Sequence, residues 1–283
     1  MSTTQTPRYV VLGSRGKTGG RVAQRLRAIG YDVVEASRST TQRFDWQDPD
    51  TWEPTLAGAT GLYATFFPDL AAPGAHETVG ALAEVARSVG IDRAALLSGR
   101  GEPAAQLGEE AFLSALPGSD VLSCAWFDQN FTEGIFEPAV AAGVFSLPAP
   151  GEAVEPFVDA DDIADCAIRV LTGERLGGVH ELTGPSAISM TEVAATLTAV
   201  TGGQVRYEPA TVGGFATILE SFGVPADDAI ELAHAFAETF DGRSAHVTTG
   251  VPNLIGRPAR SFEEFARTAY DAGQPATLVG AFR

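Results

Sequence analysis

The sequence predicts an α/β fold, a doubly wound parallel sheet with a small C-terminal α+β lobe. Short apolar runs alternate with amphipathic stretches through the first half of the chain, which is typical of parallel strands joined by helices. A glycine-spaced loop follows the first apolar run. The chain has 283 residues, 45% of them hydrophobic, so it is long enough for one large domain and a smaller lobe.

The loop over residues 13–20 is the strongest local signal. It joins an apolar run at 10–12 to an amphipathic stretch that ends near residue 29. Gly13 permits a tight turn, Gly16 lets a pyrophosphate approach the backbone, and Gly19 lets the helix lie close to the strand. The helix N-terminus then presents free N–H groups to the anion. We therefore expect a dinucleotide at Gly13, Ser14, Arg15, Gly16, Lys17, Thr18 and Gly19.

This loop has two alternative interpretations, a triphosphate-binding P-loop and a turn without a ligand. Gly16-Lys17-Thr18 is similar to the end of a triphosphate-binding P-loop, but the first glycine of that motif would fall on Val11, inside the strand. The spacing therefore excludes a P-loop. The other alternative is a glycine-rich turn without a ligand, and the strand before the loop and the helix after it favour the dinucleotide.

The remaining elements follow in order along the chain. We expect strands over 31–36, 43–46, 61–67, 94–98 and 121–126, with helices over 76–89 and 104–116. A loop over 148–156 precedes helices over 160–171, 189–200 and 226–240, short strands over 179–182 and 204–207, and a last helix after 261. The nucleotide-binding domain is placed at 1–150, with return segments near 157–185, and the small lobe at 186–283.

Charge and cysteine usage limit the class of partner. The net charge is −17, and an acidic chain repels phosphate backbones and anionic lipids, so neither a nucleic acid nor a membrane is expected. Cys124 and Cys166 match no metal-ligand spacing, and the four histidines form no pair, so no metal is expected. No signal peptide or transmembrane run is visible. These observations predict a cytoplasmic monomer or homodimer that binds a small molecule.

The end of the second strand indicates which nicotinamide cofactor binds. Arg38 lies nineteen residues after Gly19 between two serines, and an arginine fork suits the 2′-phosphate of NADP. Arg15 is able to close over the same phosphate. The alternatives are that Arg38 is an ordinary surface arginine, or that Glu35 binds the ribose hydroxyls of NAD. The sequence favours NADP, with NADPH as the reduced form.

Other strand ends supply the remaining contacts to the cofactor. Asp45 and Trp46 end the third strand and are expected at the adenine, although a polar strand end followed by a core tryptophan is the equal alternative. The segments that end the next two strands are expected to border the nicotinamide. Their predicted cofactor-binding residues are Phe66, Phe67, Ser98 and Gly99, and Arg100 is expected at the substrate.

Five motifs resemble the NmrA-like atypical short-chain dehydrogenases, and the resemblance covers nearly the whole chain. They are Leu12 to Gly19, Phe44-Asp45-Trp46, Leu97 to Glu102, Trp126 to Phe131 and Phe157 to Ala164. The Gly-Lys-Thr-Gly form is similar to the agroclavine dehydrogenase branch, which belongs to secondary metabolism. The resemblance implies a Rossmann domain with a small substrate lobe. It also implies that the substrate is bound by Trp126, Phe127, Asn130 and Phe131.

One departure from short-chain dehydrogenases concerns the catalytic tyrosine and lysine. Most members use a Tyr-x-x-x-Lys pair, in which the tyrosine passes a proton to the reduced oxygen. Lys17 is the only lysine of this chain, and no tyrosine lies between Tyr63 and Tyr207, so the pair is absent. The corresponding helix carries Glu109 and Glu110 instead.

These observations favour an NADPH-dependent reductase of a small hydrophobic imine or iminium, quinone or enone. An iminium already carries its charge and has less need of a local acid. Asp128 is the candidate to bind such a cation or relay a proton, although an exposed loop acid that caps the next turn is the alternative. A non-catalytic NADP redox sensor with a regulatory protein partner is the second hypothesis. A non-redox isomerisation or cyclisation is the third.

Overall fold

The computed structural model describes residues 6–134 and 136–271, which divide into two compact units. Of the described residues, unit 1 comprises those within 6–124, 160–182 and 249–258, and unit 2 those within 125–159, 183–248 and 259–271. The chain therefore passes several times between the units, whereas the predicted division has its main boundary at residue 150, with return segments near 157–185. No return over 249–258 was predicted, because that segment packs on α6 and β9 through long-range contacts that no local pattern reveals.

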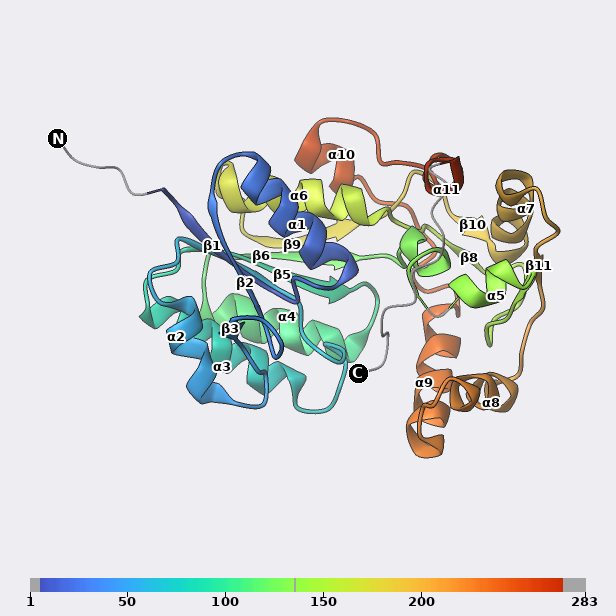
Figure 1. Ribbon diagram of the computed structural model, residues 1–283, viewed down its shortest axis with the longest axis horizontal. Coiled ribbons are helices and arrows are strands. Elements are labelled where there is room, and N and C mark those ends of the chain that lie inside the picture. The colour runs from blue at the N-terminus through green and yellow to red at the C-terminus, as the bar shows by residue number, and fades with distance from the viewer. Residues whose placement is uncertain (1–5, 135, 272–283) are drawn as a thin grey trace. The chain divides into compact units, whose positions relative to one another are not determined.

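Unit 1 is built on a seven-stranded sheet in which every strand pair is parallel (Figure 1). The strand order is β3-β2-β1-β4-β5-β6-β9, so the order reverses between β1 and β4. The strands are β1 (Arg8–Leu12), β2 (Asp32–Ser37), β3 (Gln42–Arg43), β4 (Gly61–Ala64), β5 (Arg93–Gly99), β6 (Asp120–Cys124) and β9 (Gly178–Leu182). This architecture confirms the predicted doubly wound parallel sheet.

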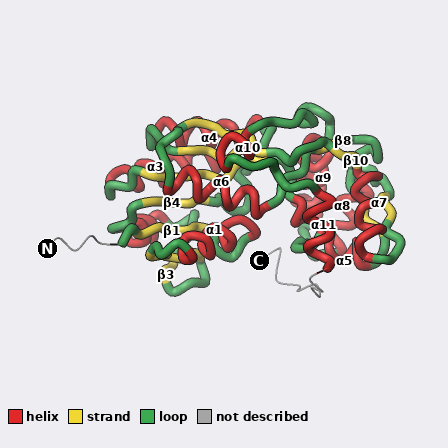
Figure 2. Tube along the Cα trace, turned by 90° about the horizontal axis from the view of Figure 1, so that it is seen from above, coloured by secondary structure: helices red, strands yellow, loops and turns green. Residues whose placement is uncertain are grey.

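Helices cover both faces of this sheet (Figures 1 and 2). One face carries α1 (Lys17–Ala28) and α6 (Ala160–Thr172), and α10 (Gly250–Ile255) packs on α6. The other face carries α2 (Trp52–Leu56), which follows the short helix η1 (Pro49–Thr51), then α3 (Ala75–Ser88) and α4 (Pro103–Ala115). Because both faces are covered, strands β1 and β4 are apolar runs that are almost completely buried.

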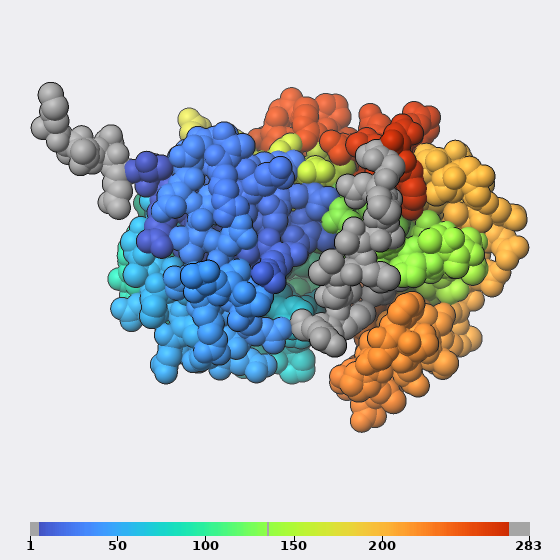
Figure 3. Space-filling view, in the orientation of Figure 1, coloured from blue at the N-terminus to red at the C-terminus, as the bar shows by residue number. Residues whose placement is uncertain are grey.

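Unit 2 is smaller and has an aromatic core. Phe131, Phe145, Phe157 and Phe215 are fully buried in it, together with apolar side chains of the surrounding helices. Its elements are η2 (Asp128–Phe131), α5 (Glu137–Ala141), β7 (Val144–Phe145), β8 (Val154–Glu155), β10 (Ile188–Ser189), α7 (Met190–Thr201), β11 (Arg206–Tyr207), α8 (Val212–Ser221), α9 (Ala226–Thr239) and α11 (Phe262–Asp271). The paired helices α8 and α9 form a protrusion of this unit, orange in Figure 3.

Most predicted elements are confirmed, with shifted ends. Two of the predicted helices begin with a capping box: Ser189 with Glu192 opens α7, and Ser261 with Glu264 opens α11. The predicted loop over 148–156 contains strand β8, because Glu155 pairs with Ile188 of a distant segment. Helix α8 was missed because Gly213 and Gly214 lower its helix propensity.

The described residues contain neither a metal-binding cluster nor a membrane-spanning helix. No group of histidine, cysteine and carboxylate side chains in this part of the chain is arranged to hold a metal ion. Within the same residues, no helix has both the length and the apolar character needed to cross a bilayer. Cys124 and Cys166 are both buried and free.

Candidate functional site

In the glycine loop of unit 1, the backbone at the start of α1 passes very close to the backbone at the end of β1. Gly13 has a φ of +72°, a region that favours glycine, and its carbonyl accepts a hydrogen bond of 2.9 Å from the Gly16 N–H. A Cβ at Gly19 would lie 2.3 Å from the Gly13 carbonyl oxygen. Helix α1 therefore contacts the end of β1 so closely that only glycine fits at residue 19.

The N-terminus of α1 is suited to an anion. The helix begins after Gly16, no side chain caps it, and its first turn contains no acidic residue. The first N–H groups of an α-helix have no partner within the helix, so an anion is their natural acceptor. The Oγ atom of Ser14 is buried beside them and has no hydrogen-bond partner among the described residues. These donors fit the diphosphate of a dinucleotide.

Similar hydroxyls lie at the ends of the neighbouring strands. Thr65 Oγ1 follows β4 and Ser98 Oγ lies in β5, and both are buried without a hydrogen bond to the described residues. A Cβ at Gly13 would lie 3.1 Å from the Cβ of Thr65, so the segment after β4 reaches the glycine loop. Buried polar atoms in a folded protein normally have partners, and these hydroxyls therefore give this edge hydrogen-bonding capacity for a polar ligand.

Arg38 lies directly after β2, as the NADP hypothesis requires. Its guanidinium carbon is 5.2 Å from the centre of the Phe67 ring, which is 52% exposed. Glu35, the alternative ligand for an NAD ribose, is paired with Arg27 of α1. The hydroxyls of Ser37 and Ser39 lie next to each other beside Arg38. The end of β2 therefore presents a cation and hydroxyls, the groups that a 2′-phosphate needs.

Asp45 and Trp46 take part in local structure at the expected adenine side. Asp45 accepts a hydrogen bond from the Gln47 N–H, and its carbonyl accepts one from the Trp52 indole at 2.8 Å. Trp46 is partly buried and packs against Phe66, with ring centres 4.7 Å apart. Trp46 is thus partly a core residue, as the alternative interpretation expected. Its contact with adenine stays a prediction.

Glu102 follows the end of β5 and precedes α4. A Cβ at Gly99 would lie 2.8 Å from the Glu102 carboxyl group, so this group packs on the strand end. Burial, and then the nearby negative charge of Asp69, raise the pKa of Glu102 to about 7. Glu102 is not among the predicted site residues, although it lies in the family motif over 97–102.

The raised pKa predicts a pH-dependent stability effect of Glu102→Gln. The folded-state pKa lies above the unfolded value, so wild type is fully stabilised at low pH and loses this contribution as the pH rises to about 7. We expect the variant to be more stable than wild type by about 2 kcal/mol at about pH 8, and equal to it near about pH 4.5. Thermal unfolding at both pH values measures this.

The control for this variant is Glu84→Gln, at an exposed position of α3. It removes the same charge from the surface. Its stability relative to wild type is therefore expected to be the same at both pH values. A Glu102→Gln variant that shows the same stability change at both pH values would contradict the predicted titration.

Arg100, which is predicted to contact the substrate, has a buried side chain. Its side chain is 2% exposed, and its Nε atom lies 3.1 Å from a carboxylate oxygen of Glu181 on β9. Its backbone N–H donates to the Cys124 carbonyl at 3.0 Å. These contacts join the segment after β5 to β6 and β9. Arg100 therefore holds the strand ends in place.

The predicted substrate residues of the segment 126–131 lie together in unit 2. Trp126 is partly buried against Phe236 and Phe240, with ring centres 5.2 and 4.8 Å away. Phe131 is completely buried in the aromatic core, so it anchors the segment to unit 2 by packing. Phe127 and Asn130 are partly exposed. The expectation that this segment contacts substrate stays a prediction for Trp126, Phe127 and Asn130.

Asp128 is 0% exposed, so the alternative of an exposed loop acid is wrong. It begins η2, and its backbone N–H donates to the Val158 carbonyl at 3.0 Å. A parallel bridge joins Phe127, the residue before Asp128, to Val158. A role toward a cationic substrate stays a prediction.

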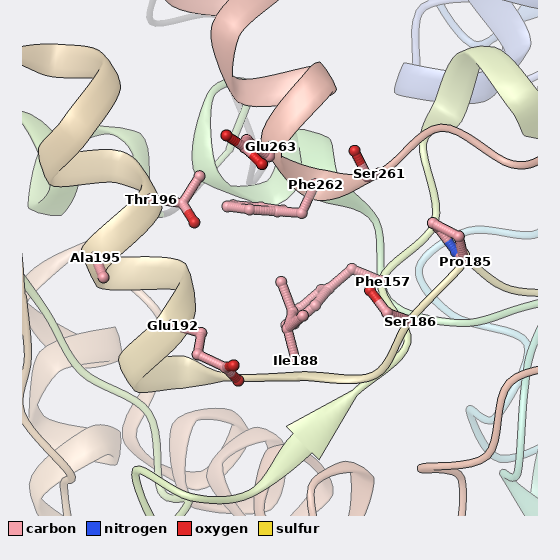
Figure 4. A pocket seen from close by; sticks show the side chains of 10 residues that line it. All are labelled: Phe157, Pro185, Ser186, Ile188, Glu192, Ala195, Thr196, Ser261, Phe262 and Glu263. Atoms are coloured by element: carbon pink, nitrogen blue, oxygen red, sulfur yellow. The ribbon is translucent and has the colours of Figure 1, made fainter.

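Unit 2 also has a surface pocket of about 340 Å³ (Figure 4). Phe157, Ile188 and Phe262 give it an apolar base, and Glu192 of α7 and Glu263 of α11 lie at its sides. It contains none of the residues predicted for the cofactor or the substrate. Glu192 is engaged in the capping box of α7, which lowers the pKa of its carboxyl group.

Sequence reasoning missed Tyr63 and Ser123, and left Glu109 without a role. Tyr63 is 0% exposed, its hydroxyl faces Thr18 and Thr65, and burial raises its pKa. Glu109 lies on the buried face of α4 opposite Ser98 and Ser123. A helical-wheel inspection would have found Glu109, because it shares the face of Ala105 and Phe112.

The parallel sheet, the glycine crossing and the uncapped helix define a Rossmann-type protein, and the chain belongs to the NmrA-like atypical short-chain dehydrogenase family. No protein-family model matches the chain. Its relatives include agroclavine dehydrogenase of Claviceps fusiformis, 30% identical over 277 residues that cover 90% of this chain and 95% of the relative. Festuclavine synthase I of Penicillium roqueforti is 29% identical and covers 91% of this chain and 96% of the relative.

Solved structures have the same fold. Triphenylmethane reductase of Citrobacter, complexed with NADP(H), matches with a TM-score of 0.78 and 19% identity over 93% of this chain and 99% of that chain. An NADPH-dependent quinone oxidoreductase of Escherichia coli, complexed with NADPH, matches with a TM-score of 0.76 and 22% identity over 92% of this chain and 99% of that chain.

Proposed function

We propose that this protein is an NADPH-dependent reductase of a small hydrophobic compound that contains a C=N, quinone or enone group. The observation that carries the proposal is the row of unsatisfied donors along one sheet edge. It runs from the uncapped α1 and Ser14 to Thr65 and Ser98, with Arg38 beyond the end of β2. This row has the order in which a dinucleotide lies across the switch point of a doubly wound sheet.

The chain's own residues have distinct tasks in this proposal. The N–H groups of the glycine loop and α1 bind the diphosphate, and Arg38 with Ser37 and Ser39 binds the 2′-phosphate. Thr65 and Ser98 lie at the edge on which the nicotinamide rests. Bound NADPH supplies a hydride. The protein therefore has to orient the substrate and provide a proton where the product needs one.

The activities for which the relatives are named support this substrate class. They include clavine dehydrogenases, an NAD(P)H azoreductase of Xenophilus azovorans, and the triphenylmethane and quinone reductases above. Most of these names describe planar compounds with a polarised or conjugated double bond. The aromatic segment 126–131 suits such a compound, because stacked rings stabilise flat ligands.

The test is NADPH consumption against a panel of one cyclic imine, one quinone, one enone and one triarylmethane dye. Binding of NADPH and NADP⁺ is measured in parallel by calorimetry. We expect turnover of at least one class and preference for NADPH over NADH. Absence of binding to either dinucleotide would overturn the proposal.

A non-catalytic NADP sensor is the second candidate, and one observation favours it. Lys17 is the only lysine, so the tyrosine–lysine pair that most short-chain dehydrogenases use cannot form. A sensor is expected to bind one redox form much more tightly and to reduce no member of the panel. That outcome would assign the protein to regulation through a protein partner.

Asp128→Asn tests whether this carboxylate stabilises a cationic substrate. We expect the KM for a protonated cyclic imine to rise about tenfold, with no change for a neutral quinone, because only the cation interacts with the negative charge. Steady-state kinetics with both substrates measures this. Asp227→Asn, at an exposed position of α9, is the control. Unchanged turnover and affinity for the imine would remove Asp128 from the site.

A further inference from the structure

A buried carboxyl group lies under the edge of the sheet in unit 1. The face of α4 that packs on the sheet consists of Ala105, Gly108, Glu109 and Phe112, so Glu109 occupies a position that normally holds an apolar residue. Glu109 is only 6% exposed, whereas Glu110 beside it is exposed. Burial of an acidic side chain is costly and calls for a compensating role or partner.

The groups around Glu109 are hydroxyls. Ser98 of β5 and Ser123 of β6 are cross-strand partners, so their side chains project to the same face of the sheet. Both face the Glu109 carboxyl group from positions that are 4% and 5% exposed. Glu109 Oε1 and Ser98 Oγ nevertheless form no hydrogen bond of ordinary geometry with the described residues. Another group, water or ligand, has to satisfy them.

Two negative charges act on Glu109. They are Glu181 of β9, which is paired with Arg100, and Glu110 of α4. Burial raises the pKa of the Cys124 thiol on β6, and Cys166 and Glu109 raise it further. Burial is the largest influence and raises the pKa of Glu109, and the two carboxylates raise it further, while Ser98 and Ser123 lower it. Glu109 is therefore biased toward its neutral form, in which it is a proton donor.

We propose that Glu109 is the proton source of this reductase and acts through the hydroxyl of Ser98, which touches the substrate. The inference rests on the proposed function. Hydride adds to the carbon of a neutral C=N or C=C–C=O group, and the electron pair of the broken π bond moves to nitrogen or oxygen. That atom takes the proton of Ser98 Oγ, Ser98 takes the proton of Glu109, and solvent reprotonates the carboxylate. The route replaces the missing tyrosine–lysine pair.

The assignment separates two kinds of substrate. A neutral imine or enone needs the proton, because its reduction leaves a negative charge on the heteroatom. A permanently cationic N-methyl iminium becomes a neutral amine when hydride adds, and it needs no proton. Loss of the proton source therefore affects the first substrate and spares the second, whereas general damage to the fold affects both.

The experiment compares Glu109→Gln with Glu110→Gln in the full-length protein. Both variants remove one carboxyl group from the same helix, and only the first is buried at the sheet edge. For Glu109→Gln we expect kcat for the neutral substrate to fall about 100-fold at unchanged KM, and kcat for the N-methyl iminium to stay the same. The alkaline decline of kcat with the neutral substrate is also expected to disappear. Glu110→Gln is expected to match wild type.

A second variant and a spectroscopic readout keep the inference independent of folding and turnover. Ser98→Ala is expected to give the same selective loss. Infrared spectra of the protein without cofactor are expected to show protonated carboxyl absorption above the ordinary pKa of glutamate, to which Glu102 and Glu109 both contribute. One component of this absorption is expected to disappear in Glu109→Gln and to remain in Glu110→Gln and Glu102→Gln.

The outcomes that would overturn the inference are distinct. Equal losses for both substrates, no loss in either variant, or an unchanged carboxyl band would each overturn the role of Glu109 and leave the reductase assignment standing. Absence of turnover of both substrates by wild type would overturn the proposed function and this inference with it.

Discussion

Gly19→Ala is expected to abolish tight cofactor binding and to destabilise unit 1 by about 3 kcal/mol. The new methyl group would lie 2.3 Å from the Gly13 carbonyl oxygen, 2.7 Å from its carbon and 3.1 Å from the Ser14 nitrogen. All three atoms are backbone, so no side-chain rotation relieves the overlap. Helix α1 must then move away from β1, and the N–H groups that face the diphosphate move with it.

Calorimetric titration with NADPH and thermal unfolding measure the two effects of Gly19→Ala. We expect the affinity for NADPH to fall by at least about 100-fold, which corresponds to about 3 kcal/mol. Gly213→Ala is the control, because a methyl group at that helical position of α8 has no atom within 4 Å. A Gly19→Ala protein with wild-type stability and affinity would show that the close crossing is not required.

Arg38→Ala is expected to weaken NADPH binding about 30-fold and to leave NADH binding unchanged. A hydrogen-bonded ion pair with a phosphate contributes about 2 kcal/mol, and only NADPH has the 2′-phosphate. The guanidinium is held above the Phe67 ring at 5.2 Å, which limits its freedom before the ligand arrives. Arg38→Lys keeps the charge and loses the planar fork, so an intermediate loss is expected.

The control for Arg38→Ala is Arg243→Ala, which removes an exposed arginine of unit 2 that is paired with Asp241. It produces the same change in net charge, and both cofactors are expected to bind as in wild type. Dissociation constants for NADPH and NADH at two salt concentrations complete the comparison. A loss of equal size for NADPH and NADH would remove Arg38 from the 2′-phosphate site.

The dinucleotide loop was predictable because its signal is local. Gly13, Gly16 and Gly19 lie within seven residues, and their spacing describes the turn and the close approach of α1. The choice between Arg38 and Glu35 depended on where β2 ends. The structure ends β2 at Ser37 and pairs Glu35 with Arg27, which leaves Arg38 at the position expected for a 2′-phosphate ligand.

Residues that become neighbours only through strand pairing were harder to predict. Ser98 and Ser123 are 25 positions apart, and only the β5–β6 register makes them partners beside Glu109. Arg100 follows a strand end, where an arginine resembles a ligand, and only the folded chain shows that it is paired with Glu181 on β9; its contact with substrate stays a prediction. Such pairings depend on segments that contact each other only in the folded chain.

The sequence by itself determined the doubly wound sheet, the dinucleotide loop and the absence of a Tyr-x-x-x-Lys pair, since each depends on local periodicity, spacing or residue count. Tertiary structure alone decided that Phe131 is core, that Asp128 is buried, and that Glu109 faces Ser98 and Ser123. Burial and neighbouring charge set whether a carboxyl group is a surface anion or a proton donor, and both are properties of the packed chain.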